Sequence, residues 1–248
     1  WSQTYTTIGP EAQATSQRAF LRNLARGEAY SQDAPTMWDV TFQTAVAQAE
    51  LEARDYPGHY YRVAYLLADG TKVHVETTRP ELTPAAVALI AHPDDERYSH
   101  LFGTTAKSPI FGVEVPVIAS TVADPQKGSG IVHCCTFGDL TDVQWWREQG
   151  LALRQVVGRD GHLAPVEFGG ELFPSLDAGR ANSAYAQLAG KTVREAQKAV
   201  VELLRDPAGC PSGEGLAPLV ADPQPIEHPV KFFEKGDRPL EFITTRQW

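Results

Sequence analysis

A β-hairpin in the first third of the chain constrains the fold more than any other feature of the sequence. Residues 60–67 and 71–77 form two runs rich in β-branched and aromatic residues, separated by a short turn that ends in Gly70. In the second run Val73 and Val75 alternate with polar residues, a period of two that is typical of a strand with one buried face. The fold must therefore accommodate an antiparallel sheet.

Short strands and single helices are expected along the rest of the chain. Three segments rich in β-branched and apolar residues predict strands or extended chain: 109–119, 130–135 and 226–248. Apolar spacing predicts three helices: 15–27, 142–149 and 193–205. A loop rich in Pro and Gly is expected over 206–225. This pattern predicts an α+β fold, with a barrel-like β-sheet and a few peripheral helices, rather than a regular βαβ winding.

Polar residues that accept hydrogen bonds from backbone N–H groups mark where the predicted helices begin. Thr15 or Ser16 can cap the first helix, and Thr141 can cap the second. Thr192 and Glu195 have the spacing of a capping box, which opens the third helix.

The charge balance limits what the chain can bind. Its 248 residues include 22 Lys and Arg against 31 Asp and Glu, a formal net charge of −9. This excludes a general basic coat for nucleic acid, so any contact with RNA has to be local. Arg18, Arg22 and Arg26 are one candidate, because a spacing of four places them on one helical face. A solvated helix face is the plainer interpretation.

Apolar runs and cysteines bear on the compartment. No run approaches the ~18–20 apolar residues of a membrane helix, so we expect a soluble protein without membrane contact. Three cysteines, two of them adjacent, cannot build a disulfide framework, which indicates a reducing cytoplasm. The sequence opens on Trp1 without a signal-peptide pattern, and we expect it to be an excerpt from a longer protein.

The segment His92-Pro-Asp-Asp-Glu96 resembles the first motif of zinc-dependent sugar N-deacetylases. A zinc site needs three protein ligands, usually including a later histidine. The later histidines that could serve as this ligand are His133, His162 and His228, and none of them lies in the downstream His-rich motif of those enzymes. The alternative is that Pro93 begins a helical turn with the acidic residues at its N-terminus. We expect no metal and no cofactor.

Cys134 and Cys135 could suggest a nucleophile or a pair of metal ligands. Adjacent residues of a strand point to opposite faces, so one site cannot use both, and burial of at least one is the plainer interpretation. The segment Gly128-Ser129-Gly130 is too short to cradle a phosphate by itself.

Two polar motifs follow predicted strands and together point to one site. Thr77-Thr78-Arg79-Pro80-Glu81 places hydroxyls, a guanidinium and a carboxylate at the end of the hairpin. The segment 128–135 leads a second strand toward Asp139 and Asp142, which are three residues apart at a helix start and can share one side.

These motifs resemble the editing domain inserted in the class I aminoacyl-tRNA synthetases for valine, isoleucine and leucine. Residues 77–81 resemble its Thr-Thr-Arg-Pro-Glu-Thr motif, and residues 92–98 its His-Pro-Asp/Glu-Asp-Glu-Arg-Tyr turn. Residues 128–142 resemble its Gly-Thr-Gly … His-Asp-x-x-Asp segment. Arg79 with Glu81 is similar to the valine branch of the family in its bacterial, actinobacterial form, and the resemblance covers nearly the whole chain.

The resemblance implies post-transfer editing, in which the aminoacyl ester of mischarged threonyl-tRNA(Val) is hydrolysed by a positioned water without a protein nucleophile. Asp139 would bind the α-ammonium group, while Thr77 and Arg79 would hold the terminal adenosine and the ester. Asp142 would read the threonine hydroxyl. The implied substrate-binding residues are Asp142, Thr78, Glu81, His133 and Cys135.

The resemblance also implies partners and domain limits. The partners would be the 3′ end of tRNA(Val) carrying threonine and the catalytic body of the parent synthetase, and we expect a monomer. Residues 1–50 would enter the insertion, 51–225 would form the editing domain, and 226–248 would return to the catalytic domain. The aminoacylation signatures His-Ile-Gly-His and Lys-Met-Ser-Lys-Ser are missing from the sequence, so we expect no aminoacylation.

Four departures from the family pattern lie in or near the motifs. Leu82 stands in place of Thr, His133 in place of Lys, Cys135 in place of Thr, and Thr-Phe-Gly over 136–138 in place of Pro-Ala-His. They leave a non-catalytic tRNA-binding insertion open as an alternative, and the zinc-dependent N-deacetylase is the other alternative.

Overall fold

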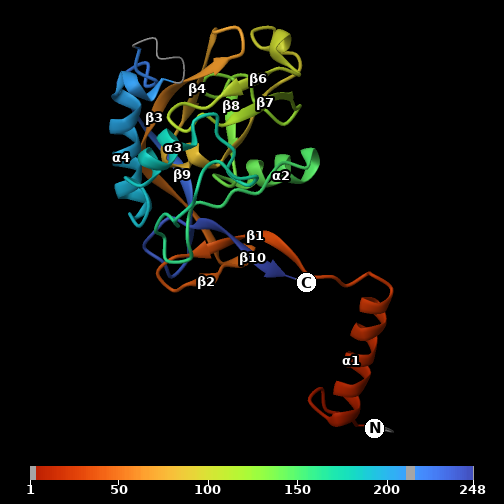
Figure 1. The fold of residues 1–248 in the computed structure, drawn as a ribbon. Helices are drawn as coiled ribbons and strands as arrows, with labels where there is room; N and C mark the ends of the chain where they lie inside the picture. The colour runs from red at the N-terminus through yellow and green to blue at the C-terminus, as the bar shows by residue number, and fades with distance from the viewer. Residues whose placement is uncertain (1–3, 211–215, 248) are drawn as a thin grey trace. The chain divides into compact units, whose positions relative to one another are not determined.

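A computed structural model describes residues 4–210 and 216–247 (Figure 1). The chain divides into two compact units, one from residues up to Pro35 together with those from Thr244 onward, and one from Thr36 to Ile243. The division falls within strands β1 (Gln32–Asp39) and β10 (Glu241–Gln247). These strands belong to a three-stranded sheet of order β10-β1-β2, where β2 is Thr44–Ala45.

The smaller unit contains helix α1, Pro10–Ala25. The expected start at Thr15 or Ser16 is wrong, because the helix begins earlier, after Gly9, with Pro10 in the first turn. Proline suits this position, since its missing N–H group would have no partner there. Arg26 is the C-terminal cap and pairs with Glu28 at 2.9 Å. A role in RNA binding for the arginines of this helix stays a prediction.

The larger unit is built on a seven-stranded sheet of order β4-β3-β6-β7-β5-β8, with β9 paired to β3. The strands are β3 Leu51–Leu67, β4 Lys72–Thr77, β5 Ala86–Ala91, β6 Thr105–Lys107, β7 Glu114–Ala119, β8 Ile131–Cys135 and β9 Gln224–Phe233. β5 and β7 are parallel, and the other pairs are antiparallel. β4 and β8, at the two ends of this order, lie near each other, but among the described residues no ladder joins them. The sheet is barrel-like without closing.

The predicted hairpin is confirmed as β3 and β4, with Tyr61 opposite Thr77 and Tyr65 opposite Val73. β3 starts nine residues earlier than expected, at Leu51, because its first half pairs with β9 instead of β4. Strand β5 was not expected. All six of its residues are buried, so it lacks the alternation that reveals a strand with one exposed face.

Three helices cover or flank this sheet: α2 Leu140–Gln149, α3 Ala178–Tyr185 and α4 Val193–Arg205. The capping box of α4 at Thr192 is confirmed. α2 is capped by Asp139 and not by Thr141, and α3 was not expected. The described residues also include four short 3-10 helices: η1 Gln48–Glu50, η2 Pro80–Ala85, η3 Ser99–Leu101 and η4 Pro207–Gly209. None of the described helices is long and apolar enough to cross a membrane.

The strand expected over 109–119 is shorter and begins at Glu114, because residues 109–111 form a turn in which Ile110 has a positive φ of 64°. The helical turn expected at Pro93 is also wrong, since residues 93–98 are non-helical turns and η3 begins only at Ser99. The expected loop over 206–225 includes η4 and the start of β9, and its residues 211–215 lie outside the described residues.

The opposite-face prediction for the adjacent cysteines is confirmed. Cys135 packs in the main hydrophobic core with Leu82 and Ala85, whereas Cys134 packs in a second cluster with Trp145. Both thiols are buried and free.

Candidate functional site

The two polar motifs lie side by side because η2 packs against the end of β8. The backbone N–H of Thr136, just after β8, donates to the carbonyl of Ala85 at 3.3 Å. A Cβ added to Gly138 would lie 3.5 Å from Leu82 Cδ1. Residues that directly follow the first motif, Leu82 and Ala85, therefore lie beside residues 136–138. That the two motifs form one site stays a prediction.

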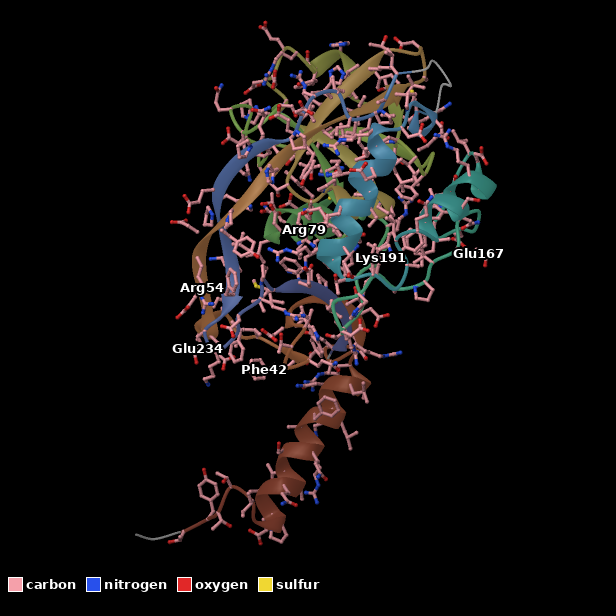
Figure 2. All side chains as sticks on the ribbon, turned by 90° about the vertical axis from the view of Figure 1, so that its left-hand side faces the viewer. Phe42, Arg54, Arg79, Glu167, Lys191 and Glu234 are labelled. Carbon is pink, nitrogen blue, oxygen red and sulfur yellow. The ribbon has the colours of Figure 1, made fainter. Side chains whose placement is uncertain are left out.

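Arg79 lies between two buried carboxylates, beside α4 (Figure 2). Its Nε donates to Glu81, and its Nη2 donates to Glu241 Oε2 at 2.8 Å. Gln197 of α4 donates to both Glu81 Oε2 at 3.2 Å and the carbonyl of Thr78 at 3.1 Å. The Glu81 side chain is fully buried, and the first motif is held in place by contacts with Glu241 and Gln197 as well as by its own Arg79–Glu81 pair.

Electrostatics keep Arg79 charged. Burial lowers its pKa, but the Glu241 and Glu81 carboxylates outweigh burial and hold the pKa above its usual value. Burial raises the pKa of Glu241, and the guanidinium of Arg79 opposes that rise. Thr77 is also engaged within the protein, since its Oγ1 accepts from the backbone N–H of Arg79 at 3.0 Å. Contacts of Thr77 and Arg79 with a ligand stay predictions.

Asp139 and Asp142 lie at the start of α2 in contrasting environments. Asp139 is exposed, and its Oδ1 accepts from the backbone N–H groups of Thr141 at 2.8 Å and Asp142 at 3.1 Å. Asp142 is buried, and its Oδ2 accepts from the backbone N–H of Gly138 at 2.7 Å. A Cβ at position 138 would meet Asp142 Oδ2 at 3.0 Å, so glycine there permits the close approach.

The two carboxylates differ in charge state as well. Burial, followed by the neighbouring Asp139 carboxylate, raises the pKa of Asp142 to about 8. Asp142 is therefore mainly a neutral carboxylic acid at pH 7 that can both donate and accept a hydrogen bond. An exposed carboxylate beside a buried carboxylic acid can bind a cationic group and a hydroxyl group of one ligand.

Curated relatives match the chain over its whole length. The chain is 57% identical over 250 residues to the valine--tRNA ligase of Thermobifida fusca (strain YX). It is 58% identical over 248 residues to that of Leifsonia xyli subsp. xyli, and 59% over 248 residues to that of Salinispora arenicola. The chain corresponds to a segment of valine--tRNA ligase.

The matches cover 100% of this chain and 27% of each of these ligases, so the chain spans about a quarter of their length. The resemblance to the valine branch of the synthetases, expected from Arg79 and Glu81, is confirmed. No protein-family model matches the chain. A LeuRS chain from Agrobacterium radiobacter K84, in a ternary complex with tRNA and LeuAMS, aligns with a TM-score of 0.35 and 16% identity over 60% of this chain and 29% of that chain.

The two residues of β8 that are predicted to bind substrate, His133 and Cys135, have different surroundings. Burial is the main cause that raises the pKa of the Cys135 thiol, and Cys135 is also close enough to Asp142, Glu81 and Arg79 for these groups to affect that pKa. His133 instead contacts Tyr65, with 3.0 Å between the Tyr65 hydroxyl and His133 Nδ1. Among the described residues no hydrogen bond or ion pair links His133 to either aspartate. Burial lowers the pKa of His133 to about 4, so its imidazole is neutral at pH 7.

Several residues of the site were missed by sequence reasoning. Glu241 is 162 positions from Arg79, and Gln197 lies inside a helix whose sequence shows only an amphipathic pattern. Arg154 was missed too. Its buried guanidinium donates to the carbonyls of Leu172 at 2.8 Å and Ala86, while its backbone N–H donates to Thr136 Oγ1 at 2.8 Å. No local signal marks these residues, because each acts through a contact distant in sequence.

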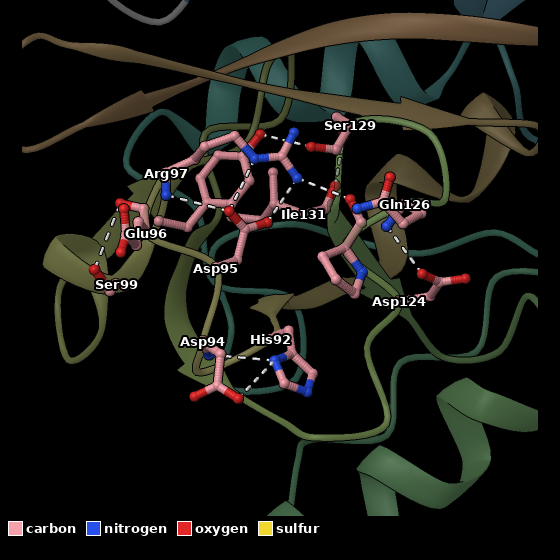
Figure 3. Close-up of polar contacts among 12 residues, drawn as sticks. His92, Asp94, Asp95, Glu96, Arg97, Ser99, Asp124, Gln126, Ser129 and Ile131 are labelled. Carbon is pink, nitrogen blue, oxygen red and sulfur yellow. Dashed lines mark hydrogen bonds and ion pairs between the residues drawn. The ribbon is translucent and has the colours of Figure 1, made fainter.

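The segment from His92 to Tyr98 is hydrogen-bonded to the loop that contains Pro125 and Ser129 (Figure 3). Asp95 accepts from Arg97 Nε at 2.8 Å and Nη2 at 2.7 Å, and Arg97 also donates to the carbonyl of Pro125 at 2.8 Å. Asp94 is exposed, with its Oδ2 3.8 Å from His92 Nδ1. Within the described part of the chain, no three His, Cys, Asp or Glu side chains are grouped to hold a metal ion. The zinc alternative gains no support from this geometry.

The buried carboxyl of Asp142 predicts how stability depends on pH. Its pKa is about 8 in the folded chain against 3.8 for an ordinary Asp, so its contribution is complete below pH 4 and is lost as pH rises toward 8. His133 acts in the opposite sense, but only between its lowered pKa of about 4 and its ordinary value of 6.5. Between pH 6.5 and 8 we therefore expect the free energy of unfolding to fall by about 2 kcal/mol. Urea unfolding across this range measures the decline.

Asp142→Asn should flatten that pH dependence, because the amide does not titrate. Asp94→Asn is the matched control, since the Asp94 side chain is 91% exposed, and it should keep the slope of the unaltered chain. An Asp142→Asn slope equal to that of the control would show that Asp142 does not hold its proton in the folded state.

Proposed function

We propose that the chain is the editing module of a valine--tRNA ligase and hydrolyses the ester that joins threonine to tRNA(Val). The observation that carries this proposal is the pairing of an exposed and a buried aspartate at the start of α2, in contact with the segment that follows β4. Asp139 offers a negative charge, and Asp142 offers a hydrogen-bonding group shielded from water. A threonyl ester carries a matching ammonium and hydroxyl.

The chemistry explains why such a site is needed. Valine and threonine have nearly the same shape, and an apolar synthetic pocket rejects the added hydroxyl only about 10²-fold, the known figure for valine--tRNA ligase itself. A second site that requires the hydroxyl separates the two amino acids further. Valine in that site would deprive the buried Asp142 carboxyl of its hydrogen bond to the threonine hydroxyl, which costs about 1–3 kcal/mol.

In the proposed reaction the chain positions the reactants and supplies no nucleophile. Asp139 binds the α-ammonium group, and Asp142 hydrogen-bonds the threonine hydroxyl. A water attacks the ester carbonyl, the bond to the ribose oxygen breaks, and that oxygen leaves as a hydroxyl, helped by the adjacent ribose hydroxyl. The thiols of Cys134 and Cys135 are unsuited to attack, because burial raises the pKa of both and keeps them protonated.

The proposal includes the partners and limits expected from the resemblance. The substrate is the 3′ end of tRNA(Val) carrying threonine, presented in the cytoplasm together with the catalytic body of the ligase, and the chain acts as a monomer. Residues 51–225 form the editing domain, between an entering segment 1–50 and a returning segment 226–248. Thr77 and Arg79, flanked by Thr78 and Glu81, hold the terminal adenosine and the ester.

Deacylation of threonyl-tRNA(Val) compared with valyl-tRNA(Val) by this chain tests the proposal. We expect the threonyl ester to be hydrolysed at least about tenfold faster, as 1.4 kcal/mol of discrimination by the Asp142 carboxyl predicts. The ester half-life without protein is the control. Hydrolysis of neither ester above that control, with both RNAs still bound, would favour the alternative of a non-catalytic tRNA-binding insertion.

A further inference from the structure

A shallow groove of about 220 Å³ lies on the larger unit between β3 and α4. Its lining combines aromatic and cationic side chains, namely His59, Tyr61, Lys198 and Arg205, with Val201, Glu202 and Pro223. The groove is smaller and more open than the pockets that enclose small molecules. Its shape suits a chain that passes over the surface better than a ligand that is enclosed.

The cations of the groove give it a local charge opposite to that of the chain. Arg205 is paired with Glu202 at 2.8 Å, and both side chains are exposed. Lys198 is also exposed, and among the described residues no carboxylate lies within ion-pair distance of it. In a chain with a net charge of −9, this lysine and the neighbouring arginine offer a local site for an anionic group.

The rings of the groove add a second kind of contact. The ring centroids of His59 and Tyr61 are 6.1 Å apart with planes tilted by 52°. His59 is exposed, so its ring face can stack on a flat group, whereas Tyr61 is mostly buried and forms the floor. Rings and cations side by side are typical of surfaces that bind single-stranded nucleic acid. An acidic peptide would use the cations but not the stacking face.

The groove adjoins the first motif. Tyr61 is the residue of β3 opposite Thr77, and its pKa responds to the charges of both Glu81 and Arg205 after burial itself. On α4, Gln197 contacts Thr78 and Glu81, and Lys198 is the next residue. A single-stranded RNA lying in the groove would therefore pass close to Thr77 and to the neighbouring residues that are proposed to bind the ester.

From this placement we propose that the groove between β3 and α4 binds the sugar–phosphate backbone and a base of the single-stranded RNA that precedes the aminoacylated end. The assignment rests on the proposed function for the identity of the strand. Lys198 and Arg205 contact phosphates, and His59 stacks on a base. Local binding of this kind also explains how an acidic chain can hold RNA.

Fluorescence anisotropy with a labelled single-stranded RNA of about eight nucleotides, at low salt, tests the groove. Replacing both cations, Lys198→Gln with Arg205→Gln, should weaken binding at least about tenfold and reduce the slope of log Kd against log salt by about 0.7 for each phosphate that is no longer neutralised. His59→Ala should weaken binding at least about fivefold, because the ring that stacks on the base is removed. Lys191→Gln, an exposed lysine just before α4 and outside the groove, should bind within twofold of the unaltered chain.

Equal binding by the groove variants and the unaltered chain would overturn the assignment, and so would an equal weakening in Lys191→Gln. Competition by a polyglutamate peptide as strong as that by unlabelled RNA would also overturn it, because the groove would then be a general anion site. RNA binding is measured at equilibrium and needs no hydrolysis. A chain that binds RNA through the groove without deacylating it would refute the proposed function alone, and deacylation with an unused groove would refute this inference alone.

Discussion

Replacing Arg79 with alanine is expected to destabilise the chain by about 3–5 kcal/mol, because it leaves two carboxylates buried without their cation. The Glu81 side chain is fully buried and that of Glu241 is 8% exposed, so neither can recover its hydration without a rearrangement. Both carboxyls would then take up protons, and the variant should recover part of its stability as pH falls. Urea unfolding at pH 5 and pH 7.5 measures both effects.

Arg26→Ala is the matched control, because Arg26 and Glu28 form an arginine–carboxylate pair that is more than half exposed, and its removal should cost less than about 1 kcal/mol. Combining Arg79→Met with Glu81→Gln and Glu241→Gln should restore most of the stability, since no buried charge remains. If Arg79→Ala and Arg26→Ala unfold at the same urea concentration, the buried cluster does not stabilise the fold as argued.

Replacing Asp139 with asparagine is expected to slow deacylation of threonyl-tRNA(Val) by roughly 30- to 1000-fold while the fold survives. The carboxylate is proposed to bind the α-ammonium group, and a charge-assisted interaction of this type contributes about 2–4 kcal/mol to binding and orientation. Asparagine is as good a helix cap as aspartate, so the hydrogen bonds to Thr141 and Asp142 can persist. Single-turnover hydrolysis measures the rate.

Asp139→Ala removes both the charge and the helix cap, so comparison with Asp139→Asn separates the two effects. The alanine variant should show the same decrease in rate and, in addition, a stability loss of about 1 kcal/mol. Glu148→Gln at the far end of α2 removes one charge from the same helix and should hydrolyse the ester at the unaltered rate. An Asp139→Asn rate within threefold of the unaltered chain would show that the ammonium is bound elsewhere.

How much of the fold could be predicted depended on the range of the contacts involved. Local signals worked well: the alternation of Val73 and Val75 gave the β3–β4 hairpin, and the Thr192 capping box gave the start of α4. Strand β5 was missed because both of its faces are buried and its sequence reads as an uninterrupted apolar run. The first half of β3 was missed because it contains Pro57 and Gly58 and pairs with β9, about 170 residues later in the chain.

The candidate site shows the same limit. The family motifs located Arg79, Asp139 and Asp142 in the sequence, and the structure brings their segments into contact around Leu82 and Gly138. Neither the pairing of Arg79 with Glu241 nor the burial of Asp142 could be predicted from spacing. Asp142 looks like an ordinary first-turn helix residue in the sequence, and its proton affinity depends on surroundings that only the tertiary structure defines.

The pairing of Arg79 with Glu241 has a consequence for the order of events during synthesis. On a growing polypeptide Arg79 emerges from the ribosome long before Glu241, and β3 emerges long before its partner β9. Contacts between residues so distant in the chain form late, because a long loop has to close first. The segment that follows β4 therefore acquires its native geometry only when nearly all of these 248 residues have been translated. Before Glu241 has emerged, one of the two carboxylates that neutralise Arg79 in the folded chain is missing, so the segment proposed to bind the ester is incomplete.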